Sequence, residues 1–125
     1  MRSSSRLGRR DRCDAGYVTA EAAVVLPTLA LFAVVLLWGL MAAASQIHCV
    51  DAARAGARAA ARSEPRAATL AAARSAAPRG AEVSVTREDD LVRVRVEAAT
   101  AGPGPLRVRL HAEAAALAED VGEEN

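Results

Sequence analysis

The chain has 125 residues, of which 52% are apolar, and 16 arginines against 15 acidic residues give a net charge of +1. Alanine supplies 32 of the apolar residues, and few large ones follow Asp51. A soluble domain of this length buries roughly two thirds of its unfolded surface, and this composition offers too few large side chains to do so. The numbers argue against a globular enzyme with an enclosed active site and favour a membrane segment with a small exposed part.

The charges are unevenly distributed along the chain. Residues 1–16 hold five arginines and two aspartates, whereas the remaining residues sum to −2. Basic residues that flank a membrane span stay in the cytoplasm. We therefore expect a single-pass protein of the cytoplasmic membrane, with its N-terminus inside and its C-terminus outside.

The apolar run Ala22–Ala44 predicts the membrane span. At 1.5 Å per residue it makes a helix of roughly 35 Å, enough to cross a hydrocarbon core of about 30 Å. Pro27 lies inside the run and is expected to kink the helix, which a bilayer tolerates because neighbouring groups satisfy the freed carbonyl. A removable signal peptide with a small-residue site at 42–44 is the alternative, but the run exceeds the usual length of about 7–15 residues.

An acidic residue, Glu21, directly precedes the apolar run. A charge inside a membrane helix is costly, although less so near the interface. One interpretation is structural: the carboxylate reaches the interface and favours the helix N-terminus. The other depends on its neighbours, because a basic leader ends at Gly16 and Glu21 is the fifth residue after it.

This arrangement resembles the class III processing signal of type IV pilins and pseudopilins. The resemblance implies that a prepilin peptidase cuts the Gly16–Tyr17 bond and that Glu21 pairs with the new α-amino group of Tyr17. The stretch G-Y-V-T-A-E-A-A-V-V-L-P-T-L, with Pro27 six residues after the acid, is similar to the start of TadE-like minor pilins of tight-adherence systems. Residues 51–62 resemble the A-A-R-x-G-A-R segment of that family, so the likeness covers about 17–62.

The helix is expected to continue to about Arg62. Arg54 and Arg58 lie one turn apart on one stripe, and Gly56 and the alanines around them are small. Small faces let helices pack closely, so these residues could pack pilin helices in a filament, with the arginines paired to acids on a neighbour. The alternative, to which we give equal weight, is that the arginines form a solvated stripe on an alanine-rich helix.

After Gly80 the apolar period becomes two, which predicts strands at 82–87, 91–98 and 106–111, a turn at Asp89–Asp90 and a loop over 100–105. The sheet should be antiparallel, with an apolar face covered by the outer part of the helix, so the fold class is α+β. Residues 112–118 are ambiguous between strand and helix. The chain then divides into a basic leader (1–16), a membrane and pilin helix (17–62), a linker that could hold a short helix (63–80), a β domain (81–118) and an acidic tail (119–125).

Other chemistry has little support in the sequence. The sheet arginines 93, 95, 107 and 109 lack the interleaved aromatics that stack bases, so we expect no nucleic-acid partner and a solvated or self-paired face. His48 and His111 fit no metal spacing, and no serine has a triad context, so no enzyme activity, cofactor, metal or small-molecule substrate is expected. Cys49 would be the lone cysteine of the mature chain, either as a packing residue or in a disulfide between chains.

The resemblance implies a minor pilin or pseudopilin whose partners are membrane lipid, the prepilin peptidase, other pilin subunits and the tight-adherence assembly proteins, with a role in cell adhesion and a place in a surface filament. The main alternative is an uncleaved, single-pass envelope protein with a small outer interaction domain. An exported protein that loses the span is the third.

Overall fold

The computed structural model describes residues 7–102 and 104–118 and holds two helices and three strands in this range. The expected acidic tail and the first six residues of the leader lie outside it. Two compact units divide the chain, Met1–Leu37 and Trp38–Asn125. The α+β class is confirmed by a long apolar N-terminal helix followed by a three-stranded antiparallel sheet.

The first helix, α1, covers Leu7–Ala61. It includes Pro27, and the hydroxyl of Thr28 donates a hydrogen bond of 2.7 Å to the carbonyl of Val24 one turn back. Cys13–Ala61 is long and apolar enough to cross a membrane, with a mean hydropathy of 2.5 in its most apolar window and none of that window buried. A membrane-capable helix near the N-terminus is therefore present, and it starts earlier than residue 17 because the end of the leader is helical too.

α1 ends in a tight turn with a left-handed residue, and Pro65 follows this turn instead of ending the helix itself. Ser63 has a φ of 57°, its amide donates to Ala60, and the amide of Glu64 donates to Ala59. This pairing satisfies carbonyls that a helix end would otherwise leave open. The short helix α2 follows at Arg66–Ala76, inside the segment where the sequence allows one.

The sheet has the order β1-β2-β3, with both pairs antiparallel. The strands are β1 (Glu82–Glu88), β2 (Leu91–Ala101) and β3 (Arg107–Leu117). The turn between β1 and β2 falls at Asp89–Asp90, as expected, and Asp89 adopts a positive φ of 50°.

Strand boundaries differ from the sequence prediction at the end of β2 and at both ends of β3. Thr100, expected in a loop, belongs to β2 and is opposite Val108, so the connection to β3 is shorter than predicted. Residues 112–117 extend β3 because they pair along β2 as far as Leu91. Alanine has the highest helix propensity, but propensity is a weak determinant that tertiary context overrides, here through cross-strand pairing. Leu106, expected on the apolar face of the third strand, lies before it and is 60% exposed.

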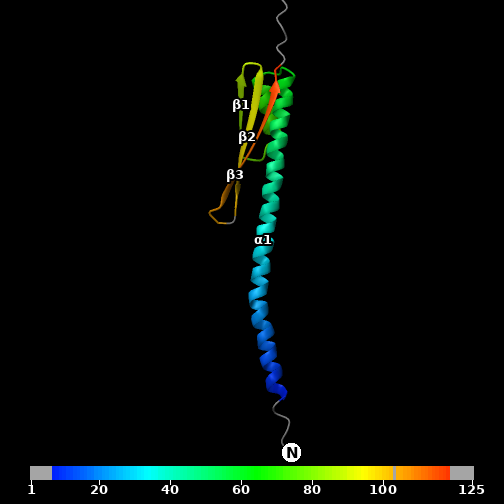
Figure 1. Cartoon of the computed structure of the whole chain (residues 1–125), viewed down its shortest axis with the longest axis vertical. Coiled ribbons are helices and arrows are strands. Elements are labelled where there is room, and N and C mark those ends of the chain that lie inside the picture. The colour runs from blue at the N-terminus through cyan, green and yellow to red at the C-terminus, as the bar shows by residue number, and fades with distance from the viewer. Residues whose placement is uncertain (1–6, 103, 119–125) are drawn as a thin grey trace, which may run out of the picture. The chain divides into compact units, whose positions relative to one another are not determined.

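The core lies between the inner face of the sheet and the small residues of α1 and α2, within the unit that starts at Trp38. Figure 1 shows the strands alongside the C-terminal half of α1. Val94 and Val96 are fully buried at the centre of this core. The expected cover by the outer part of the helix is present, and α2 adds to it through Thr69 and Ala73. Two clusters of buried residues form this core: Cys49, Ala52, Ala53, Val96, Ala98 and Ala112, and Ala60, Ala73, Val85, Val92 and Val94.

Candidate functional site

The expected processing junction lies on an open part of α1. Gly16, Tyr17 and Glu21 are exposed, and Tyr17 keeps 75% of its surface. A Cβ added to Gly16 would meet no atom within 4 Å, so packing in the described residues does not require glycine there. Glycine in a helix interior costs about 0.5–1 kcal/mol relative to alanine.

Tyr17 and Glu21 are four residues apart on the same helix, so they lie one above the other on one face. Side chains at this spacing have Cβ atoms about 5–6 Å apart. The Glu21 side chain therefore projects from the same helix face as Tyr17. The sequence-predicted pair is thus on one helix face, although the amine exists only after cleavage.

A band of exposed apolar side chains follows Glu21. Pro27 lies within it, and the large residues of the band are between 45% and 68% exposed. Exposed apolar surface of this extent marks contact with a membrane or a partner. The band consists of Val24, Val25, Leu26, Leu29, Leu31, Phe32, Val34, Val35, Leu36, Leu37, Leu40 and Met41.

Gly56 packs inside its own chain. A Cβ placed there would be 2.9 Å from Cγ1 of Val94 and 3.1 Å from Cβ of Ala73, so the glycine lets α1 approach the sheet and α2 closely. Arg54 and Arg58 are exposed, and neither forms an ion pair with another residue in the part of the chain described. The small face is therefore used for internal packing, while the arginine stripe is open to solvent or a partner.

The outer face of the sheet pairs some of its own charges. Glu113 accepts hydrogen bonds from Arg93 and from Arg95, the latter at 2.9 Å from Nη2, and Arg93 also lies 4.0 Å from Glu88. Hydrogen bonds from Arg95 and Arg93 hold the pKa of Glu113 below its ordinary value. The same contact with Glu113 raises the pKa of Arg93. Four acids are near enough in the sequence to pair with these arginines, namely Glu82, Glu88, Glu97 and Glu113. The strand register brings Glu113 directly opposite Arg95.

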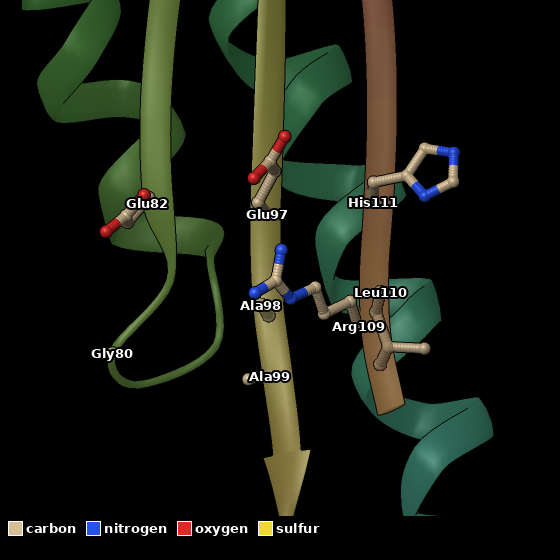
Figure 2. Close-up of a pocket in the computed structure, with 8 residues that line it drawn as sticks. All are labelled: Gly80, Glu82, Glu97, Ala98, Ala99, Arg109, Leu110 and His111. Carbon is tan, nitrogen blue, oxygen red and sulfur yellow. The ribbon is translucent and has the colours of Figure 1, made fainter. Parts of the chain in front are cut away.

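A hollow of about 410 Å³ lies at the other end of this face (Figure 2). Glu82, Glu97 and His111 are aligned across the three strands by the register. Figure 2 shows the Arg109 side chain reaching from β3 across β2, with its guanidinium over Ala98 and on the side of Glu97. Within the described residues, no three His, Cys, Asp or Glu side chains are placed to hold a metal ion.

Sequence reasoning missed two contacts within the unit that begins at Trp38. One is the fit of Gly56 against Val94, which a glycine in an alanine-rich stretch does not reveal. The other joins Trp38 of α1 to Gly102 at the end of β2, where an added Cβ would be 3.1 Å from Cζ2 of the indole. The only signal for the second was the position of the sole tryptophan near the end of the apolar run.

Comparisons with known proteins give one informative similarity. The chain is 47% identical over 78 residues to the protein named apoptosis inhibitor Rv3655c of Mycobacterium tuberculosis. The match spans 62% of this chain and 62% of the length of that relative. No protein-family model matches the chain, and no solved structure matches it.

Proposed function

We propose that this chain is a TadE-like minor pilin or pseudopilin, processed by prepilin peptidase and incorporated into a tight-adherence type IV pilus. The observation that carries the proposal is the order of features on α1: an exposed Gly16–Tyr17 bond, Glu21 one turn further on, and an exposed apolar band directly after it. The other proposed partners are membrane lipid, fellow pilin subunits and the assembly proteins of the system.

The helical state of the junction gives Gly16 a physical role in this proposal. A peptidase needs an extended bond in its active site, so the turn around residue 16 must unwind before cleavage. Glycine favours unwinding because it is about 1 kcal/mol less favourable in a helix than alanine. Its lack of packing contacts also leaves the peptidase free access to the backbone.

Cleavage would place two charges at the membrane edge, the α-amino group of Tyr17 and the carboxylate of Glu21. Each alone would lose hydration when the helix moves into the apolar centre of a filament, and pairing offsets part of that loss. Because the amine of one subunit can also reach Glu21 of the next, the pair would set the axial position of a subunit. The exposed apolar band would supply the contacts between neighbouring helices.

The first test is the N-terminus of the protein. The full chain should be expressed with a prepilin peptidase, purified from membranes and analysed by mass spectrometry. We expect a chain that begins at Tyr17, and a Gly16→Val variant that keeps Met1. Gly39→Val is the matched control, because Gly39 is an equally open glycine of the same helix and should leave processing intact. A wild-type chain that retains Met1 would refute the proposed processing.

The second test concerns Glu21. Glu21→Ala should still insert into membranes and be cleaved, but its incorporation into sheared pili should fall severalfold. Asp14→Ala is the control, since Asp14 is an acid of the leader that cleavage removes. Unchanged incorporation of Glu21→Ala would show that the pairing role is wrong.

The similarity to a protein named apoptosis inhibitor favours a second candidate function. In this alternative the chain stays uncleaved, α1 anchors it in the cytoplasmic membrane, and the small domain after the span acts outside as an interaction domain. The same N-terminal analysis separates the two proposals, because this alternative requires Met1. A start near Ser45 would contradict both, since the span would then have been removed.

A further inference from the structure

The hairpin that joins β2 and β3 reaches back to the membrane end of the outer unit. The amide of Gly102 donates a hydrogen bond of 2.7 Å to the carbonyl of Leu106, which closes the hairpin. Gly102 lies against the indole of Trp38. The described residues of the turn, Gly102 and Gly104–Leu106, are called the hairpin tip below.

The contact with Trp38 sets the depth of the hairpin tip. Trp38 is six residues before Ala44, where the apolar run ends. At the helical rise per residue, the tip lies about 9 Å below the end of that run. If α1 spans a bilayer, this depth is within the roughly 5–10 Å at which interfacial apolar groups lie at the headgroup–acyl boundary, and tryptophan is a favoured residue of this region.

The side chains at this level suit an interface. Leu106 is 60% exposed, and the segment 98–112 contains no acidic residue. Arg107 follows the tip directly and is exposed. Next to Trp38, a mainly apolar cleft of about 330 Å³ is lined by residues that also include Met41 and Arg79. Apolar tips flanked by arginines match the acyl boundary and the phosphate layer of a membrane.

We propose that the hairpin tip is a second membrane contact, in which Leu106 reaches the boundary between headgroups and acyl chains and Arg79 and Arg107 extend to the lipid phosphates. This inference rests on the proposed membrane span of α1 but not on pilin processing. Its consequence is mechanical: helix and hairpin would hold the small unit against the membrane surface at two points. Extraction of a subunit would then have to release both.

The test compares two exposed leucines at opposite ends of β3. Leu106 and Leu117 are 60% and 68% exposed, and about 36 Å of extended strand separates them. Both native cysteines of the full chain are first replaced, by Cys13→Ser and Cys49→Ala. Three variants of this chain then each receive one new cysteine, Leu106→Cys, Leu117→Cys or Leu31→Cys. In each variant, the new cysteine is labelled with a polarity-sensitive nitrobenzoxadiazole dye. Each is reconstituted into vesicles of phosphatidylcholine and phosphatidylglycerol that contain a lipid-attached spin-label quencher.

We expect strong quenching at position 31, intermediate quenching with a blue-shifted emission at position 106, and the unquenched emission of an aqueous dye at position 117. Equal, water-like signals at 106 and 117 with quenching at 31 would overturn the hairpin contact and leave the tip for a protein partner. Loss of quenching at all three positions would overturn the membrane span itself, and the inference with it.

The arginines are tested in the same vesicles. Arg79→Gln with Arg107→Gln should reduce quenching at position 106, and phosphatidylcholine alone should give a weaker signal than the anionic mixture. Arg54→Gln with Arg58→Gln is the matched control, because these exposed arginines lie farther along α1 from the tip. Circular dichroism of each variant checks that the sheet is formed. A signal that is the same for all variants and both lipids would overturn the role of Arg79 and Arg107.

Discussion

Gly56→Ala should destabilise the unit that begins at Trp38. The new Cβ would be 2.9 Å from Cγ1 of Val94 and 3.1 Å from Cβ of Ala73, and the first distance is too short for carbon atoms that do not move. Overpacking of this kind costs about 1–3 kcal/mol. Alanine returns about 1 kcal/mol because it favours a helix over glycine. We therefore expect a net loss of about 0–2 kcal/mol from these two terms.

A second substitution shows whether the contact with Val94 causes the loss. Val94 is fully buried, and Val94→Ala alone should cost about 2 kcal/mol through lost burial and the cavity left behind. In the double variant the shortened side chain makes room for the new Cβ. Its total cost should thus be smaller than the sum of the single costs, and the difference measures the contact.

The natural reporter for this experiment is Trp38, the only tryptophan in the chain, which lies against Gly102 of the hairpin. Thermal unfolding of the full chain in detergent would be followed by its fluorescence, and 1 kcal/mol corresponds to about 4–8 °C for a domain of this size. Gly39→Ala is the control, since an added Cβ meets nothing there. If Gly56→Ala is no less stable than Gly39→Ala and shows no coupling to Val94, the proposed close contact is wrong.

Two further predictions use the sheet. Arg95 and Arg93 lower the pKa of Glu113 in the folded chain, so their contribution to folding stability is present at neutral pH and is lost as the pH falls below about 4. Glu113→Gln should therefore flatten the dependence of the melting temperature on acid pH. An unchanged pH profile in this variant would contradict the prediction. Asp89→Gly should raise stability by about 0.5–1 kcal/mol because Asp89 has a positive φ, whereas Asp90→Gly, without that conformation, should give no gain in the same melting assay.

Most of the fold could be predicted because its signals are local. The apolar run that ends at Ala44 is long enough to cross a membrane as a helix, and the alternation of valine with charged residues over 91–96 predicts a strand with one buried face. The end of the third strand could not be predicted. Residues 112–117 are mostly alanine, which carries little contrast between faces, so only their pairing with β2 shows that they are extended.

The proposed site also combines features that the sequence predicts with one that it does not. The order of Gly16, Tyr17, Glu21 and Pro27 is a property of the sequence, and the structure adds that these residues lie on an exposed helix. The function of the small residues near Gly56 could not be read locally, because a small face packs equally well against a neighbouring subunit or against its own sheet. The coordinates show that Gly56 packs against Val94 of its own chain.

By itself, the sequence determined that this protein has a helix able to span a membrane, a basic segment before it, and a small alternating sheet after it, since length, charge and period are local quantities. The tertiary structure alone decided which of the four acids pairs with Arg95, which residue Gly56 packs against, and how far along α1 the β2–β3 hairpin extends. These depend on strand register and on the docking of the sheet against α1, which join residues far apart in the chain and leave no periodic trace in it.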